Sequence, residues 1–313
     1  MDDPMRRFVV TGGCSPLGRR ILEGLRALPT CEHVRGVDAK ARGGNGEAED
    51  LDFVPFAPDH RPFTEYLEKN RIDTVIHCGL VPDRTGLAGP VHEADVIGTM
   101  CLGAAIAHEG SSVRNWVIAS SSSIYTVDSH SALLQNERSI HSTEHETLAS
   151  SIAEAEDYAR DVALRRPHLN VAILRLQHVV GRNTQSPLAR LFAQDRIPVP
   201  IGFDPAIQLL HIDDAASAII FATRSELAGL YNVASEGLIH WRDAVRVSGK
   251  QAIAVPPASL AMLEPLLRRF QIPFVPADLL DLLRFGHAID TQKIRRAGWR
   301  PEYDQHRCLS STD

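Results

Sequence analysis

The chain has 313 residues, 44% of them hydrophobic, which is enough to bury a large core and excludes a disordered protein. Its formal net charge of −6 is mild and leaves no basic stripe for phosphate backbones or anionic lipids, so neither nucleic acid nor a membrane is an expected partner. No apolar run reaches the length of a bilayer span, and the chain starts with a strand-like segment in place of a signal peptide, so a cytoplasmic location is expected.

The five cysteines are odd in number and show neither C-x-x-C spacing nor a nearby pair of histidines. Reduced, structural cysteines and no metal site are therefore expected. Only four lysines are present, at positions 40, 69, 250 and 293. This scarcity limits the catalytic chemistry considered below.

Strand-like apolar runs alternate with amphipathic helical stretches along the first 176 residues. The alternation predicts an α/β protein with a doubly wound parallel sheet and helices on both of its faces. The predicted strands are Phe8–Thr11, His33–Asp38, Thr74–Cys78, Trp116–Ser120 and Val171–Leu176, and the predicted helices lie near 17–28, 62–70, 91–109 and 145–166.

Residues 8–18 read Phe-Val-Val-Thr-Gly-Gly-Cys-Ser-Pro-Leu-Gly, which is an apolar strand, a glycine-rich turn and the start of a helix. Such a turn aims backbone N–H groups and the positive end of the helix dipole at an anion, usually the pyrophosphate of a dinucleotide. The same turn also occurs as a plain connection between a strand and a helix. Contacts to the cofactor are predicted for Gly12, Ser15, Pro16, Leu17 and Gly18.

Asp38 ends the second predicted strand, 20 residues beyond Gly18. A carboxylate at this distance accepts hydrogen bonds from both ribose hydroxyls of an adenosine and repels a 2′-phosphate. The turn and Asp38 together therefore predict NAD, and not NADP, as the cofactor.

The ends of three further strands are candidate ligand sites, because ligands of open parallel sheets bind beyond the carboxyl ends of the strands. These ends lie at residues 78–81, 120–125 and 177–181. Cofactor contacts are predicted there for Cys78, Gly79, Leu80 and Ser120, and substrate contacts for Val81, Ser122, Tyr125 and His178.

Beyond Gly181 the pattern loosens into shorter helices, a turn-rich stretch from Ile197 to Pro205 and a proline-spaced C-terminal region. This change predicts a smaller lobe that faces the substrate. The expected division is a dinucleotide-binding domain over residues 1–176 and a substrate-binding lobe over residues 177–313, interleaved with the first.

Several ordered motifs resemble those of one family over nearly the whole chain. Residues 117–125 (Val-Ile-Ala-Ser-Ser-Ser-Ser-Ile-Tyr) resemble its serine-carrying strand, residues 210–216 (Leu-His-Ile-Asp-Asp-Ala-Ala) a helix of its substrate lobe, and residues 298–301 (Gly-Trp-Arg-Pro) its C-terminal signature. The chain thus resembles an extended short-chain dehydrogenase/reductase of the NAD-dependent epimerase/dehydratase type, the group that includes nucleotide-sugar 4-epimerases. The resemblance implies a Rossmann-type fold, NAD and a small-molecule substrate.

The chain departs from this family in its catalytic motif. The family uses Y-x-x-x-K, in which the tyrosine removes the hydroxyl proton while hydride leaves for the nicotinamide, and the lysine lowers the tyrosine pKa. None of the five tyrosines is followed four residues later by lysine, and alignment places the two positions at Leu148 and Ile152. Standard Tyr-Lys catalysis is therefore not expected.

Three binding positions of the family also differ. Ser15 replaces the middle glycine of the T-G-x-x-G-x-x-G turn, Ala57 an acidic residue that contacts adenine, and Ile207 an arginine that binds the nucleotide. Serine followed by Pro16 is a good helix start, so the turn is expected to survive with weaker cofactor affinity. Sugar nucleotides are a weaker expectation than the fold suggests.

Three residues are candidates for catalysis. The resemblance makes Ser121 the serine that hydrogen-bonds the reacting oxygen, although it also belongs to a serine-rich strand end. His178 stands where sugar-nucleotide epimerases carry a phosphate-binding asparagine, and it could bind an anion, replace the missing acid/base or be structural. His145 lies close to the expected tyrosine position, where polar residues also serve as helix caps.

The leading hypothesis is an NAD-binding, epimerase/dehydratase-like isomerase or oxidoreductase that acts on a small organic or sugar-derived substrate by altered chemistry. The alternative is a non-catalytic NAD-binding sensor or accessory protein, which the apolar pair Leu148 and Ile152 favours. The helices near 91–109 and 145–166 form the dimer interface in many relatives, so the resemblance implies a homodimer, although their apolar residues could equally be internal core. Fold similarity alone does not supply the function.

Overall fold

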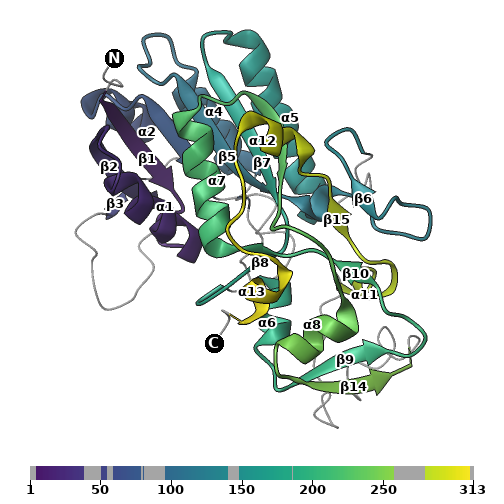
Figure 1. The fold of residues 1–313 in the computed structure, drawn as a ribbon. Helices are drawn as coiled ribbons and strands as arrows, with labels where there is room; N and C mark the ends of the chain where they lie inside the picture. The colour runs from purple at the N-terminus through teal and green to yellow at the C-terminus, as the bar shows by residue number, and fades with distance from the viewer. Residues whose placement is uncertain are drawn as a thin grey trace.

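The structure, a computed structural model, describes residues 5–38, 51–54, 59–78, 80, 96–139, 148–184, 186–256 and 279–310. Its centre is a seven-stranded sheet in the order β12-β7-β5-β4-β1-β2-β3, and every neighbouring pair is parallel (Figure 1). The strands are β1 (Arg6–Thr11), β2 (Cys31–Asp38), β3 (Leu51–Phe53), β4 (Thr74–His77), β5 (Asn115–Ser121), β7 (Asn170–Leu176) and β12 (Gly229–Val233).

Helices cover both faces of this sheet, because successive strand residues point to opposite sides. In β1, Phe8 and Val10 pack with the helices α1 (Pro16–Arg26) and α7 (Ile212–Arg224). Val9, between them, packs on the other face with α2 (Arg61–Lys69), α4 (Gly98–Ile106) and α5 (Leu148–Arg165). The predicted doubly wound α/β fold of the Rossmann type is confirmed.

The predicted strands and helices of the first 176 residues are all present, with shifted ends. The third predicted helix, near 91–109, is α4 from Gly98 to Ile106, and residues 81–95 lie outside the described part. The sheet also gains β3 and β12 at its two edges, which the sequence pattern did not include among the strands of the first domain.

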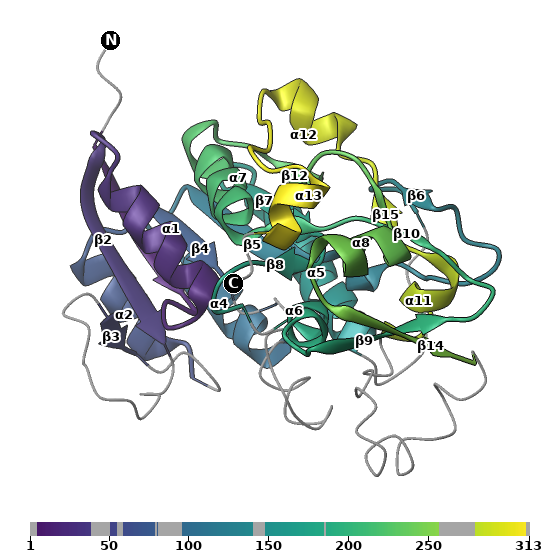
Figure 2. The same ribbon diagram turned by 60° about the horizontal axis from the view of Figure 1, so that its bottom comes forward.

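A second hydrophobic core lies beyond the carboxyl ends of the strands. Both views place α8 beside the parallel pair β9 and β14, at the end of the molecule away from α12 (Gln292–Ala297) (Figures 1 and 2). The elements of this core are α6 (Pro187–Phe192), β9 (Arg196–Pro200), α8 (Trp241–Val247), β14 (Gln251–Val255), α11 (Leu282–Phe285) and α13 (Gln305–Ser310).

The expectation of a turn-rich stretch from Ile197 to Pro205 is wrong for its first part. Residues 196–200 form β9, and all of them after Arg196 are buried. Its five residues include two prolines, which locally disfavour a strand and made it hard to predict from the sequence. The strand forms because it pairs with β14, more than fifty residues later. The expected division into domains at residue 176 stays a prediction.

Short strand pairs connect the two cores and bring late segments to the ends of the early strands. The 3-10 helix η2 (Ser122–Ile124) directly follows β5. The pairs are β6 (Leu134–Gln135) with β15 (Ala288–Ile289), β8 (Val179–Val180) with β11 (Leu210–His211), and β10 (Ala206–Ile207) with β13 (Ile239–His240).

Candidate functional site

The glycine-rich turn between β1 and α1 requires glycine at two positions. Gly12 has a φ of +75°, a conformation that L side chains rarely adopt. A Cβ on Gly18 would lie 2.3 Å from the carbonyl oxygen of Gly12, so only glycine lets the helix approach the turn this closely. The turn therefore has the tight backbone that a dinucleotide site needs.

Ser15 caps α1 and turns its side chain back into the turn. Its Oγ donates a hydrogen bond to the carbonyl oxygen of Gly12 at 2.7 Å and accepts one from the N–H of Gly18 at 3.0 Å. Pro16 has no N–H, so among the first three residues of α1 only Leu17 keeps an N–H for a phosphate. The helix start thus offers a pyrophosphate fewer donors than a turn with glycine at position 15 would.

Asp38, at the end of β2, lies beside the turn as the spacing predicts. The backbone N–H of Cys14 donates to its Oδ2 at 2.8 Å, which ties the carboxylate to the turn. Its position across the turn from the helix start fits an adenosine ribose whose phosphates face α1. The residues present therefore fit NAD, and the contacts of individual residues stay predictions.

Of the predicted cofactor residues after β4, Cys78 packs against the glycine-rich turn. Cys78 is buried, and a Cβ on Gly12 would lie 3.3 Å from the Cys78 Cβ. Burial raises the pKa of its thiol to about 12, so Cys78 is an unreactive packing residue. Leu80 is also buried. The candidates Gly79, Val81 and His145 lie outside the described residues.

The end of β5 carries three serines with different partners. Ser120 is buried and donates to Glu156 Oε1 at 2.5 Å. Ser121 caps η2, and its Oγ lies 2.5 Å from Ser123 Oγ. Ser122 donates to Gln177 Oε1. Of the three hydroxyls, the one on Ser121 bonds only within its own turn. It could therefore bond a substrate without breaking a contact to a distant part of the chain.

A buried ion pair lies under this strand end. Arg175 Nη2 and Glu156 Oε2 are 2.6 Å apart, and both side chains are fully buried. The Arg175 guanidinium also lies 4.8 Å from the centroid of the Tyr125 ring. Because Glu156 neutralises it, Arg175 positions Tyr125 without giving the region a net positive charge.

Tyr125 is held in place by a hydrogen bond from its hydroxyl group and by burial of its ring. Its hydroxyl donates to Asn232 Oδ1 at 2.7 Å, and the side chain is almost fully buried. Burial raises the pKa of this phenol, an effect that the nearby Arg175 partly offsets. Tyr125 therefore stays protonated at neutral pH and is not suited to act as a base.

The position expected for the catalytic lysine is apolar and closed. Ile152 is fully buried and packs in a small cluster. No ammonium group fits there without a charged partner. The members of this cluster are Ile124, Tyr125, Ile152, Ala234 and Ile289.

His178 has an imidazole neighbour that the sequence reasoning missed. Its ring meets that of His287 edge to face, with centroids 5.7 Å apart and planes at 76°. The Nε2 atoms of both histidines are buried and have no hydrogen-bond partner within the described structure. Burial lowers the pKa of His178 to about 4, and burial with the neighbouring His178 lowers that of His287 to about 3. Both rings are therefore neutral at pH 7.

His287 follows a glycine that the fold requires. Gly286 has a φ of +74°, and a Cβ there would lie 2.3 Å from the carbonyl oxygen of Ala206. This close approach places His287 in a β-bridge with Ile207. The contact joins residues 80 positions apart, so no local pattern could reveal it.

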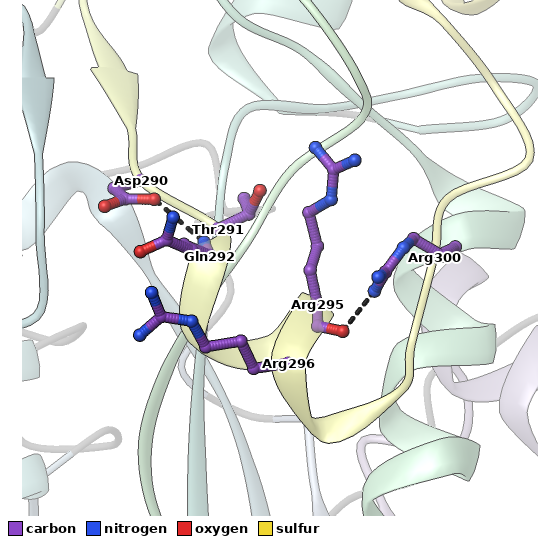
Figure 3. A pocket seen from close by; sticks show the side chains of 6 residues that line it. All are labelled: Asp290, Thr291, Gln292, Arg295, Arg296 and Arg300. Carbon is purple, nitrogen blue, oxygen red and sulfur yellow. Dashed lines mark hydrogen bonds between the residues drawn. The ribbon is translucent and has the colours of Figure 1, made fainter.

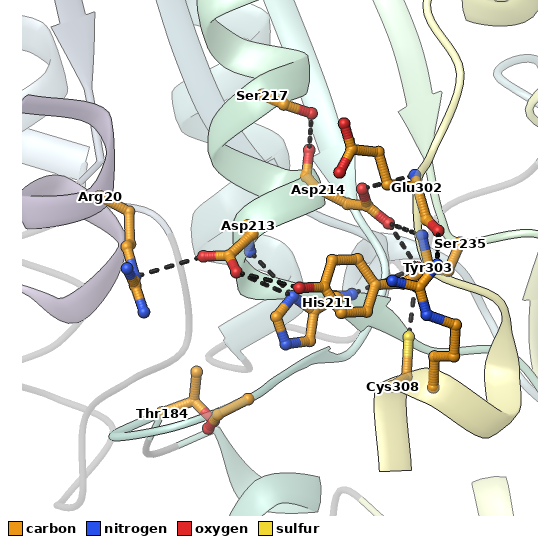
Figure 4. A network of polar contacts seen from close by, with 12 residues as sticks. Arg20, Thr184, His211, Asp213, Asp214, Ser217, Ser235, Glu302, Tyr303 and Cys308 are labelled. Carbon is orange, nitrogen blue, oxygen red and sulfur yellow. Dashed lines mark hydrogen bonds and ion pairs between the residues drawn. The ribbon is translucent and has the colours of Figure 1, made fainter. Parts of the chain in front are cut away.

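A polar network fastens the last segment of the chain to the start of α7 (Figure 4). Asp214 is buried and accepts hydrogen bonds from the N–H groups of Glu302 at 2.8 Å and Tyr303 at 3.1 Å. The Tyr303 ring stacks on His211, the N-cap of α7, with centroids 3.7 Å apart. This network explains the His-Ile-Asp-Asp motif structurally, since its side chains bond within the protein.

A basic hollow of about 380 Å³ lies on α12 and the turn after it (Figure 3). Arg295 bonds Glu236 at 3.2 Å, and Arg300 Nη1 donates to the carbonyl oxygens of Arg295 and Trp299. α12 packs against β12, four strand spacings from β1, or roughly 19 Å across the sheet. The hollow is therefore separate from the dinucleotide turn. Its lining residues are Asp290, Thr291, Gln292, Arg295, Arg296 and Arg300.

The described residues contain no group of three or more His, Cys, Asp or Glu side chains that could hold a metal ion. Among the same residues, no helix is long and apolar enough to cross a membrane.

The fold and the turn define a dinucleotide-binding α/β protein with a second core beside the cofactor edge of its sheet. The model of the NAD-dependent epimerase/dehydratase family matches residues 8–234. The chain belongs to this family, and NAD is the family's cofactor, as Asp38 and the turn predicted.

Relatives extend over almost the whole chain. Uncharacterized proteins of Mycobacterium tuberculosis and Mycobacterium bovis are each 30% identical over 305 residues, which cover 94% of this chain and 80% of theirs. Among solved structures, a candidate epimerase from Burkholderia cenocepacia has a TM-score of 0.74 at 21% identity, covering 99% of this chain and 98% of its own.

Two structures with NAD bound show the same fold at lower identity. The dTDP-glucose 4,6-dehydratase of Bacillus anthracis has a TM-score of 0.72 at 16% identity, covering 98% of this chain and 95% of its own. The UDP-glucuronic acid 4-epimerase of Bacillus cereus has a TM-score of 0.71 at 15% identity, covering 97% and 96%. These likenesses establish the fold, and the chemistry of this chain rests on its own residues.

Proposed function

We propose that the protein is an NAD-dependent enzyme that acts on a small organic or sugar-derived substrate without a tyrosine-lysine pair. The observation that carries this proposal is the combination of an intact dinucleotide turn with an imidazole at the end of β7 whose Nε2 has no hydrogen-bond partner in the described structure. The turn retains Gly12, Gly18 and Asp38 in a cofactor-binding arrangement. The buried Nε2 of His178 lies at the strand end where ligands of this fold bind.

Bound NAD would supply a hydride acceptor beside the ends of β4 and β5. The chain's own residues would then act on the substrate oxygen. Ser121 polarises that oxygen through its hydroxyl, and His178, neutral at pH 7, accepts a hydrogen bond from the substrate hydroxyl. A pKa of about 4 makes His178 a weak base, so any proton transfer to it must coincide with loss of the hydride.

The second candidate is a non-catalytic NAD-binding sensor or accessory protein. The closed apolar cluster around Ile152 favours it, because polar chemistry in this family requires a charged group at that position. The two candidates differ in one observable property. In an enzyme, bound NAD changes its redox state when a substrate is added, and in a sensor it does not.

The first experiment is a calorimetric titration of the cofactor-stripped protein with NAD+ and NADH, with NADP+ as the comparison. Binding of NAD+ and NADH, with weaker binding of NADP+, is the expected result. Asp38→Ala is expected to abolish the preference for NAD. Glu32→Ala, an exposed carboxylate on the same strand, is the matched control and should bind NAD like the unmodified protein. No binding at millimolar NAD would overturn the proposal.

A homodimer through α4 and α5 is a further part of the proposal. Met100 on α4 is 40% exposed and Leu164 on α5 is 79% exposed, so each of the two helices presents a large apolar side chain to the solvent. Light scattering after size-exclusion chromatography should show a dimer that Met100→Glu weakens. Leu133→Glu, an exposed leucine outside these helices, is the control. A monomer at micromolar concentration would refute the assembly.

A further inference from the structure

Three rings from distant parts of the chain meet at the substrate end of the sheet. Tyr125 follows β5, His178 follows β7, and His287 precedes β15. His287 meets both other rings edge to face, at 5.7 Å from His178 and 6.2 Å from Tyr125. Hydrogen bonds from Gln177 lock the group, since Gln177 Nε2 donates to the His287 carbonyl oxygen at 3.2 Å and its Oε1 accepts from Ser122.

The two imidazoles are the unsatisfied members of this group. The hydroxyl of Tyr125 has its partner in Asn232, but the Nε2 atoms of His178 and His287 are buried without one in the described structure. His287 is only 2% exposed. A buried polar atom without a partner costs stability, and a ligand that bonds to it removes this cost.

Among the described residues, the positive charge that lies against this group of rings is already neutralised. The Arg175 guanidinium lies over the Tyr125 ring of this group, and Glu156 neutralises it. Ile207, buried and bridged to His287, occupies the position where a nucleotide-binding arginine was expected. Burial keeps both rings uncharged at neutral pH, and a proton on one would repel a proton on the other.

A neutral imidazole nitrogen either donates or accepts one hydrogen bond, depending on the tautomer. A hydroxyl group can satisfy both cases, because it donates and accepts. A diphosphate only accepts and brings charge into an apolar site, where it would be poorly solvated. The pair therefore suits an uncharged, hydroxyl-bearing part of a ligand.

We propose that His178 and His287 form a recognition site for the hydroxyl groups of an uncharged polyol moiety, and that this end of the sheet does not bind a nucleotide diphosphate. The inference rests on the proposed function, since it names the class of substrate that this site takes. It assigns a substrate-contacting role to His287 and replaces anion binding as the role of His178.

The test uses the full-length protein with 15N-labelled histidine and NMR spectra that report the imidazole nitrogens. Glucose serves as the polyol probe and UDP as the diphosphate probe, each added to saturation at pH 7. Glucose is expected to shift the Nε2 signals of both histidines, and UDP is expected to leave them unchanged. Shifts caused by UDP, or no shifts with glucose, would overturn the proposal.

Variants separate recognition from packing. His287→Phe keeps a ring for the edge-to-face contacts but removes the polar nitrogen, so it should weaken glucose binding at least about tenfold. His287→Gln keeps a polar atom and serves as the second variant if the first does not fold. His168→Phe, an exposed histidine elsewhere, should bind glucose like the parent. Equal glucose affinity in His287→Phe would show that the pair only packs.

The result can be distinguished from a failure of the proposed function. NAD binding is measured by calorimetry on the same samples, and the histidine signals are recorded with and without NAD. If NAD binds and glucose does not shift the histidines, this inference fails while the NAD-dependent function stands. If NAD does not bind, the function fails, and the glucose response is then judged on the cofactor-free protein.

Discussion

The glycine-rich turn and the histidine pair are two binding regions built in opposite ways. The turn is held by hydrogen bonds between residues three apart, such as Ser15 with Gly12 and Gly18 with Ser15. The histidine region is held by bonds between residues more than a hundred apart, from Tyr125 to Asn232 and from Gln177 to His287. The first region depends on its own segment, and the second on the whole fold.

The two regions also differ in how completely their polar atoms are satisfied. The Ser15 hydroxyl donates one hydrogen bond and accepts another, both within the turn. His178 and His287 keep buried nitrogens that no described residue satisfies. The hydrogen bonds of the turn are thus made within its own segment, whereas the polyol ligand that we propose would supply the partners of the two histidine nitrogens.

The substitution with the largest expected effect on stability removes the buried ion pair that supports the histidine region. Glu156→Gln removes one partner of a fully buried ion pair and leaves the Arg175 charge uncompensated, so the free energy of unfolding should fall by about 3–5 kcal/mol. Chemical denaturation measures this change. Glu154→Gln, an exposed glutamate on the same helix, should change it by less than about 0.5 kcal/mol. A small loss in Glu156→Gln would show that the pair does not support this region.

The pH dependence of stability tests the burial of the histidines. Both pKa values are lower in the folded protein, at about 4 and about 3, than the ordinary value of 6.5, so below pH 6.5 the unfolded chain binds more protons. The contribution of each histidine should be fully present above pH 6.5 and should fall by on the order of 3 kcal/mol as the pH drops to 4. Thermal unfolding across this range measures the slope. His287→Phe removes one of the two contributions and should reduce the slope by about half, and an unchanged slope would refute the burial argument.

The next prediction concerns a substitution in the glycine-rich turn. Gly18→Ala places a Cβ against the Gly12 carbonyl, which cannot move without changing the turn, so stability should fall by about 1–3 kcal/mol. NAD affinity, measured by calorimetry, should fall at least about tenfold, because the donors of the turn are displaced. Gly24→Ala lies on the same helix and meets only the flexible end of Ile220, so it is the control. Normal NAD affinity in Gly18→Ala would contradict the assignment of the turn.

The smallest expected effect is a gain in NAD affinity at the glycine-rich turn. Ser15→Gly frees the N–H of Gly18 for a phosphate, so NAD affinity should rise by about threefold to tenfold. Losing the cap should lower stability by only a few tenths of a kcal/mol, roughly the cost of serine to glycine at an N-cap. Calorimetry and denaturation on the same sample measure both changes. Weaker NAD binding would show that the Ser15 side chain itself contributes to the cofactor site.

Much of the fold could be predicted from the sequence, because its elements are local. The alternation of apolar runs and amphipathic helices predicted five central strands of the sheet, and the spacing from Gly18 to Asp38 placed the carboxylate beside the turn. The strand β9 was missed, because it depends on pairing with β14 and contains prolines that locally disfavour a strand.

The sequence by itself determined the family resemblance, the NAD turn and the absence of a tyrosine followed four residues later by lysine. These features depend on residue identity at short spacing, where the backbone geometry is nearly invariant. Only the tertiary structure decided that Ser120 bonds Glu156, that Tyr125 is closed by Asn232 and that His287 lies against His178. These contacts depend on the order of the strands in the sheet and on which residues it buries. The pKa of a histidine depends on the same burial and on the groups around its ring, and not on its neighbours in the sequence.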